Sequence, residues 1–246
     1  MPEASSAPEA GEFASFWHGP LNPFAYACLA SFPRAGARLS LFSYDPRLDV
    51  PPGVRLEDAR RICPDESMVR RYMANGKPSI ATFADMFRYK MIQTTGSCWV
   101  DTDMICLAYP SFAAEAAVDV DQKWGALGPF LLTPVLTKYG LYERALDPHV
   151  CYPIEPEQFW KLFLPSYRDR VAANVSGATL LHLWSEAIVW SGYDFATCPP
   201  PGSYLNDCFR AAGALGRFSR TCDEDEVRRL MARQIAESER PAGPRA

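Results

Sequence analysis

Strand-like and helix-like segments alternate over the first 107 residues of this chain, and this alternation limits the folds it can adopt. Strands are predicted at residues 13–17, 38–44, 54–56 and 97–107, and helices at 23–32, 65–73 and 79–95. The helix at 79–95 is the clearest, because apolar side chains recur at about 3.6 residues and Gly96 follows as a stop signal. Strands that alternate with helices favour parallel pairing. We therefore predict an α/β fold with a central mixed, mostly parallel sheet.

The part beyond residue 110 has a less regular pattern. Strands are predicted at 124–127, 151–154 and 179–184, and helices at 130–146, 156–164 and 204–212. Residues 1–12 read as a mobile leader, and the segment 223–246 as a charged helical tail. Residues 13–222 are expected to form a single domain whose two halves meet near residue 110.

Composition excludes several classes of protein. The 246 residues carry a net charge of −4, which argues against nucleic acid as a general partner. There is no secretion signal and no apolar run of the roughly 18–20 residues that span a bilayer, so a cytoplasmic protein without a transmembrane segment is predicted. A peripheral contact of the tail with a membrane surface is left open. The 8 cysteines form no C-x-x-C pair and are predicted to be mostly reduced and buried.

Two carboxylates, Asp101 and Asp103, follow the apolar run 98–100. Alternate side chains of a strand share a face, so the two groups would converge there. Such a pair resists burial unless a cation neutralises it, and Mn²⁺ or Mg²⁺ prefers oxygen ligands. The spacing therefore predicts a metal site, while the alternative that both aspartates cap a turn stays open.

Asp85 and Arg88 lie three residues apart in the predicted helix at 79–95, and so share one of its faces. A carboxylate beside a guanidinium suits the binding of sugar hydroxyls and phosphate. The alternative is a simple intrahelical ion pair.

These residues together resemble a known family. The stretch Ala84-Asp85-Met86-Phe87-Arg88-Tyr89, then Gly96, then Trp99-Val100-Asp101-Thr102-Asp103 is similar to the pattern A-D-x-x-R-Y followed by G-G-x-Y-x-D-x-D. That pattern belongs to the glycosyltransferases with a DXD sugar-binding region, which include Och-type and α1,4-glycosyltransferases and bacterial capsular-polysaccharide enzymes. Looser likeness extends to residues 16–19, 125–129 and 182–184. Ser97 and Trp99 depart from the usual Gly and Tyr.

The resemblance implies a GT-A fold and a metal-dependent hexosyltransferase of polysaccharide biosynthesis. Such an enzyme moves a sugar, with retention, from a UDP- or GDP-sugar to a saccharide or other hydroxyl acceptor, using Mn²⁺ or Mg²⁺. By matched position, Asp85 and Arg88 would bind the donor sugar, and Asp101 the ribose or sugar. Asp103 would hold the metal on the diphosphate, and Trp17 would stack on the nucleotide base. Asp101, Asp103 and Arg88 are the residues expected to be catalytic.

Three further positions follow from the looser matches. His182 would join Asp101 and Asp103 at the metal, Trp184 would contact the leaving phosphate, and Gly128 would belong to a loop on the donor side. His182 stands in an apolar run, so a buried core histidine is the alternative. Two other functions also remain open: a nucleotide- or saccharide-binding protein without catalysis, and a nucleotide-sugar hydrolase.

Overall fold

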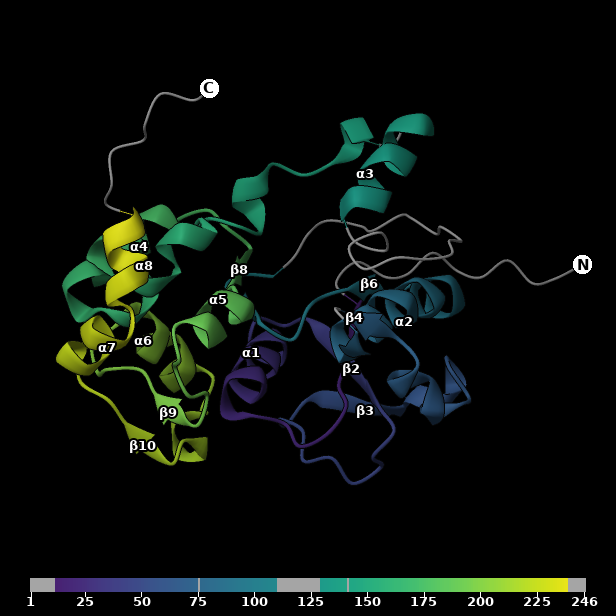
Figure 1. Cartoon of the computed structure of the whole chain (residues 1–246), viewed down its shortest axis with the longest axis horizontal. Coiled ribbons are helices and arrows are strands. Elements are labelled where there is room, and N and C mark those ends of the chain that lie inside the picture. Colours follow the sequence, from purple (N-terminus) through teal and green to yellow (C-terminus); the bar gives the residue numbers. More distant parts are fainter. Residues whose placement is uncertain (1–11, 75, 110–128, 141, 239–246) are drawn as a thin grey trace, which may run out of the picture. The chain divides into compact units, whose positions relative to one another are not determined.

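The computed structural model describes residues 12–74, 76–109, 129–140 and 142–238 (Figure 1). The chain divides into two compact units. The first takes its described residues from the stretch up to 21, from 37–102 and from 129–146, and the second takes them from 22–36, 103–109 and 147–238.

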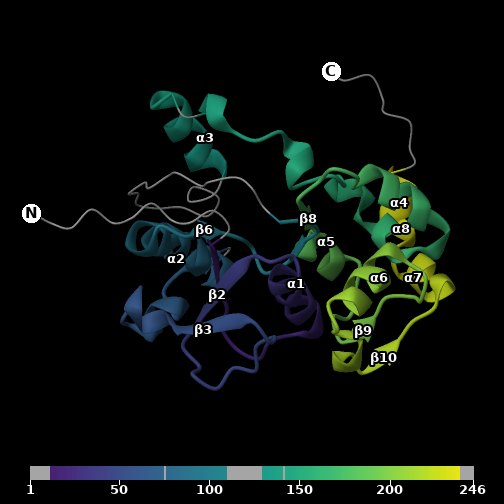
Figure 2. The ribbon, with the colours of Figure 1, turned by 180° about the vertical axis from the view of Figure 1, so that it is seen from behind.

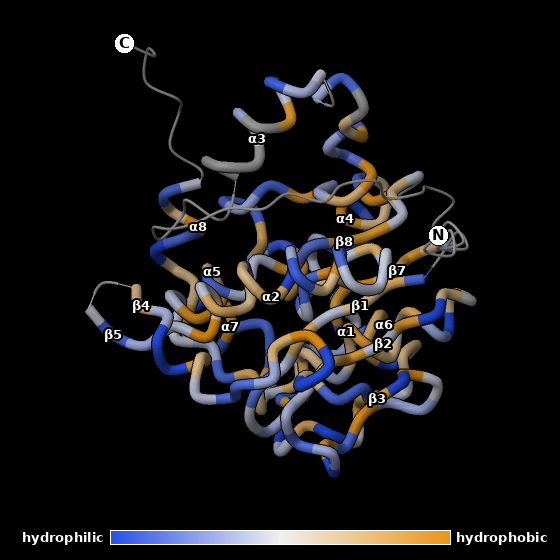
Figure 3. Tube along the Cα trace, turned by 90° about the vertical axis from the view of Figure 1, so that its right-hand side faces the viewer, coloured by the Kyte–Doolittle hydropathy of each residue, from blue (hydrophilic) through white to orange (hydrophobic). Residues whose placement is uncertain are grey.

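A four-stranded parallel sheet forms the centre of the first unit. Its strands are β1 (Glu12–Phe16), β2 (Arg38–Ser43), β3 (Val54–Asp58) and β6 (Cys98–Trp99), in the order β3-β2-β1-β6. Residues 13–16 are all buried, as expected for a parallel strand covered on both faces. Hydrophobic positions also line β2 (Figure 3). The predicted α/β fold with a parallel sheet is confirmed.

Helix α2 (Ile80–Thr95) packs against this sheet and lies beside β6 in both ribbon views (Figures 1 and 2). Ser79 caps its first turn by accepting a backbone N–H, and Gly96 ends it with a φ of 69°. On its buried face the Phe87 ring lies 4.5 Å from that of Phe16, between centroids. The helix predicted at 79–95 is confirmed, and its first turns line the cavity described in the next subsection.

The rest of the first unit departs from prediction at two places. Only a 3₁₀ turn at Glu66–Arg70 forms where a helix at 65–73 was predicted, because β4 (Met73–Ala74) pairs with β5 (Lys77–Pro78) in an antiparallel hairpin. Helix α3 (Pro129–Lys138) is shorter than the predicted 130–146, and further 3₁₀ turns lie at 59–61 and 142–144. The strand predicted at 124–127 lies outside the described residues.

The second unit is mainly helical. It begins with α1 (Pro23–Arg34), where the Asn22 side chain accepts the N–H of Ala25 at 2.8 Å, as the cap and proline at its start predicted. Strands β7 (Met104–Cys106) and β8 (Leu180–His182) pair antiparallel. The remaining elements are α4 (Arg168–Asn174), α5 (Ser185–Trp190), β9 (Thr197–Cys198), α6 (Tyr204–Ala211), β10 (Arg220–Thr221), α7 (Glu224–Leu230) and α8 (Ala232–Ser238), with 3₁₀ turns at 148–150, 156–163, 165–167 and 215–217.

Two strand predictions were wrong. The segment 97–107 is not one strand but two, β6 and β7, which pair in different sheets and are separated by a turn at 102–103. No strand forms at 151–154, because the amides of Cys151 and Tyr152 both donate to the carbonyl of Pro148 and Pro153 has no N–H to give. The strand at 179–184 is confirmed in the shorter form β8, and the helix at 204–212 as α6.

The predictions for the two ends of the chain and for its cysteines can be compared with the described residues. Of the expected leader only Glu12 is described, and it belongs to β1; the predicted tail contains α7 and α8, with residues 239–246 outside the described part. All eight cysteines lie in described stretches as free thiols, and five are buried. Across the described ranges, every helix is too short or too polar to cross a membrane.

Candidate functional site

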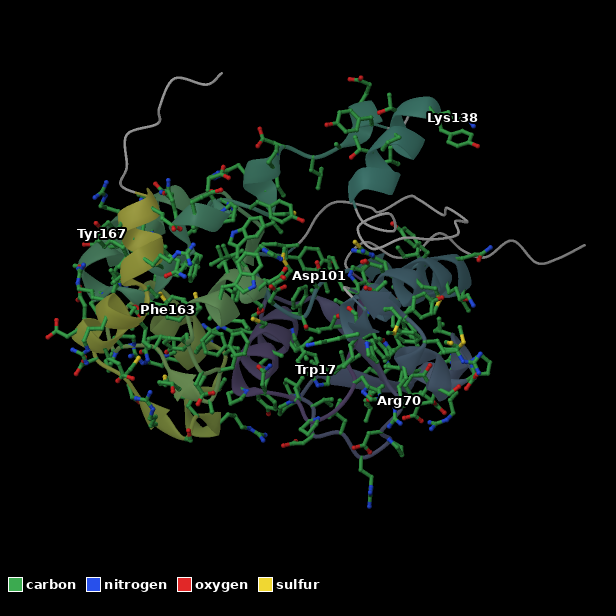
Figure 4. The ribbon with its side chains drawn as sticks, viewed as in Figure 1. Trp17, Arg70, Asp101, Lys138, Phe163 and Tyr167 are labelled. Carbon is green, nitrogen blue, oxygen red and sulfur yellow. The ribbon has the colours of Figure 1, made fainter. Side chains whose placement is uncertain are left out.

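A cavity of about 410 Å³ opens in the first unit at the end of β1. It is lined by residues that follow β1, by the first turns of α2 and by the chain after β6. Three of the predicted site residues, Trp17, Asp85 and Asp101, stand in its wall; Figure 4 labels Trp17 and Asp101. His18 and Trp99 line it as well. The carboxyl ends of parallel strands are where open α/β sheets bind ligands.

Asp85 and Arg88 form an ion pair on α2, and each side chain is about one quarter exposed. Burial raises the pKa of the Asp85 carboxyl above its ordinary value, and the negative charge of Asp101 raises this pKa further. The positive charge of Arg88 lowers the pKa of Asp85 but does not cancel the effect of burial. The Arg88 Nε is buried and finds no hydrogen-bond partner among the residues that the structure describes. Arg88 therefore has donor capacity beyond its pairing with Asp85.

Asp101 is oriented by Trp99, which stands where the resembled pattern has Tyr. The indole Nε1 of Trp99 donates to Asp101 Oδ1 at 2.8 Å. The guanidinium carbon of Arg88 lies 5.7 Å from the Trp99 ring centroid, within cation–π range. Trp99 thus holds one oxygen of the Asp101 carboxylate.

Asp103 and His182 are brought together by the β7–β8 pair of the second unit, in which Met104 is opposite His182. His182 Nε2 lies 3.3 Å from Asp103 Oδ1, and the Ser185 backbone N–H donates to Asp103 Oδ2 at 3.0 Å. Burial alone would raise the pKa of the Asp103 carboxyl, but His182 and Ser185 outweigh it and hold the pKa below its ordinary value. Asp103 is therefore a carboxylate at neutral pH.

Trp184 fixes the ring of His182. Its backbone N–H donates to His182 Nδ1 at 3.3 Å, and its φ of 58° makes it the single non-glycine residue of the described chain in the left-handed region. The Trp184 indole N–H donates to the carbonyl of Ile154 at 2.8 Å. The ring of Tyr152 lies 5.5 Å from that of His182, between centroids. Nothing in the sequence pattern around residue 152 pointed to this neighbour.

Asp101, Asp103 and His182 make up a group that could hold a metal ion. Each offers one ligand atom, and these atoms lie within 4.8 Å of one another. Thr102 alone separates the two aspartates, so the chain itself keeps them close. The side chains meet at a turn, not along the continuous strand from which their convergence was predicted. All three predicted metal ligands are therefore present together.

The donor set suits a divalent cation of intermediate hardness. Two carboxylate oxygens fit Mg²⁺ or Mn²⁺, and an imidazole nitrogen favours Mn²⁺ of the two. A cation bound at His182 Nε2 would move the ring proton to Nδ1 and so displace the Trp184 contact. At 3.3 Å that hydrogen bond is longer than the usual range of about 2.7–3.2 Å and is therefore weak. The residues fit a metal ion.

Gly128 lies outside the described residues. Trp184 uses its indole N–H within the protein, and its role toward a phosphate stays a prediction.

Comparisons of the chain with protein-family models, with curated proteins and with solved structures found no match. No family is therefore assigned, and the likeness to glycosyltransferases stands as a hypothesis that rests on the residues alone.

Proposed function

We propose that the protein is a metal-dependent glycosyltransferase that moves a sugar from a nucleotide-sugar donor to a hydroxyl acceptor. One observation carries the proposal: Asp101 both lines the cavity of the first unit and belongs to the group of three that could hold a cation. A cavity with one such carboxylate, Asp101, in its wall suits a ligand that joins a nucleoside and a sugar through a diphosphate. The volume of about 410 Å³ is within the roughly 300–1,000 Å³ of small-molecule sites.

Each side chain has a role in the proposed reaction. When bound, Mn²⁺ or Mg²⁺ would act as a Lewis acid toward the diphosphate of the leaving nucleotide. Asp101 and Asp103 would hold it, with Asp101 Oδ1 positioned by Trp99 and Asp103 Oδ2 positioned by the Ser185 N–H. Asp85 would accept hydrogen bonds from sugar hydroxyls, and Arg88 would place fixed positive charge near the developing anion. Trp17 would offer an aromatic face to the base.

The test is a panel of UDP- and GDP-sugars with Mn²⁺, scored for release of the nucleoside diphosphate. Release that a saccharide acceptor accelerates supports transfer, and analysis of the anomeric product tests retention. Asp103→Asn should abolish the release, because it removes a ligand charge. The matched control is Asp169→Asn, which changes a carboxylate that is 93% exposed and contacts Arg168.

Three results would overturn the proposal. Release that no acceptor accelerates indicates a nucleotide-sugar hydrolase. Metal-dependent nucleotide binding without release indicates a binding protein. Equal activity of Asp103→Asn and the wild type excludes the metal group from the reaction.

A further inference from the structure

A second cavity lies in the second unit and shares no residue with the candidate site. Its volume is about 490 Å³, and its walls come from the 3₁₀ segment 156–163 and from helices α5 and α8. The buried ring of Phe159 forms part of its apolar lining. The volume is again in the range of roughly 300–1,000 Å³ in which proteins bind small molecules.

Trp190, the last residue of α5, forms an exposed aromatic wall of this cavity. Its side chain is 72% exposed, the highest value among the large hydrophobic residues in the described part of the chain. Indole has a broad apolar face that packs well against C–H groups, and leaving it in water forgoes that gain. The position therefore favours a ligand with a flat, C–H-rich face.

Polar groups also line this cavity. Gln234 on α8 lines the cavity, and its Oε1 is shielded from solvent with no hydrogen-bond partner in the described stretches. Its amide oxygen is thus not committed to another protein group. Glu157 also lines the cavity, as do Arg233 and Glu237, which pair one turn apart along α8 at 2.8 Å between Nε and Oε1. Hydrophilic and hydrophobic positions both occur along α8 (Figure 3).

The exposed indole of Trp190 and the polar side chains of this cavity together limit the class of ligand that it can bind. A purely apolar molecule would leave the shielded amide oxygen of Gln234 without a hydrogen bond. An anion would meet the carboxylates of Glu157 and Glu237, against the single guanidinium of Arg233. A neutral pyranose has a C–H face for the indole and hydroxyls that both donate and accept hydrogen bonds.

We propose that this cavity is a saccharide-binding site, in which Trp190 stacks on a pyranose ring and Gln234 and Glu157 bind its hydroxyls. The site would take one unit of a neutral glycan. The proposal rests on the geometry of this cavity and does not require that the protein transfers sugars.

The test is a titration of the full chain with neutral oligosaccharides of glucose, mannose, galactose and N-acetylglucosamine. It is read by tryptophan fluorescence and calorimetry, with EDTA and without nucleotide, so that the candidate metal site does not contribute. At least one oligosaccharide should bind, and Trp190→Ala should weaken that binding roughly tenfold or more. Gln234→Ala should weaken it several-fold. The matched control is Val189→Ala, a neighbour on α5 that is 55% exposed and stands outside the cavity wall; it should bind as the wild type does.

Two outcomes would overturn the proposal. One is that no oligosaccharide of the panel binds, or that Trp190→Ala binds as tightly as the wild type while circular dichroism shows both to be folded. The other is that an apolar dye or an anionic sugar displaces the bound glycan and binds more tightly than it. Because the assay contains no donor and no metal, its failure is separate from a failure of the proposed transferase activity.

Discussion

Trp99→Phe should weaken Mn²⁺ binding without disturbing the fold. The substitution removes the indole N–H that donates to Asp101 Oδ1 at 2.8 Å. It keeps an aromatic ring beside Arg88, whose guanidinium carbon lies 5.7 Å from the present ring centroid. The variant therefore isolates one hydrogen bond that orients a predicted metal ligand.

The size of the effect follows from the nature of that hydrogen bond. A hydrogen bond to a charged group contributes about 1.5–3 kcal/mol, and the lower end applies because Asp101 is exposed. Since about 1.4 kcal/mol is a tenfold change in affinity, the Kd for Mn²⁺ should rise roughly tenfold. In other metal sites, loss of a group that orients a metal ligand lowers the metal affinity about 10–100-fold, and the tenfold change expected here lies within that range.

Calorimetric titration with Mn²⁺ measures this change. Trp190→Phe makes the same substitution at a tryptophan outside the candidate site and should leave the Kd unchanged. His182→Ala removes a ligand and should weaken binding further than Trp99→Phe does. If Trp99→Phe binds Mn²⁺ within twofold of the wild type while His182→Ala binds it poorly, the Trp99 hydrogen bond does not orient Asp101 for the metal.

Three further changes test the fold and its electrostatics. Phe87→Ala removes a fully buried ring that packs on Phe16, and should lower the free energy of unfolding in urea by about 3–5 kcal/mol; a loss below about 1 kcal/mol would contradict the packing described. Gly96→Ala places a side chain at a φ of 69° and should cost about 1–2 kcal/mol in the same assay, whereas an unchanged midpoint would argue against the left-handed cap. For Glu224, burial alone would raise the pKa, but Ser166 and Arg228 hold it below its ordinary value. The stability advantage of the wild type over Glu224→Gln should thus be complete at neutral pH and disappear as the pH falls through the lowered pKa; an advantage that grows in acid would refute it.

Local signals in the sequence were sufficient for much of the first unit. Ser79 and Gly96 mark the two ends of α2, and its apolar spacing identifies the buried face. The alternation of strands and helices was enough to predict parallel pairing. These features are encoded within a few residues of each other, which is why they can be read without tertiary information.

The parts that could not be predicted depend on distant contacts. The break between β6 and β7 arises because β6 pairs with β1 whereas β7 pairs with β8, some 75 residues further along the chain. The same pairing sets Asp103 against His182, a partnership for which the sequence offered only a family likeness. The donors from Trp99 and Ser185 depend on the turn at 102–103, and periodicity carries no information about such a turn.

The cavity beside Trp190 illustrates the same limit. Trp190 and Gln234 are 44 positions apart, on α5 and α8. An exposed tryptophan at a helix end and a glutamine in a charged tail are each unremarkable in a sequence. Only the structure shows that Trp190 and Gln234 line the same cavity, where both could contact one ligand.

The binding of UDP and GDP in the presence and absence of Mn²⁺ shows whether Asp101, Asp103 and His182 hold a metal that binds a nucleotide, and it needs neither the donor sugar nor the acceptor. Calorimetry on the wild type, Asp103→Asn and the control Asp169→Asn provides the comparison. One nucleoside diphosphate should bind the wild type and the control only when Mn²⁺ is present, and Asp103→Asn should lose this binding. Equal affinity with and without Mn²⁺, or unchanged Mn²⁺-dependent binding by Asp103→Asn, would contradict it.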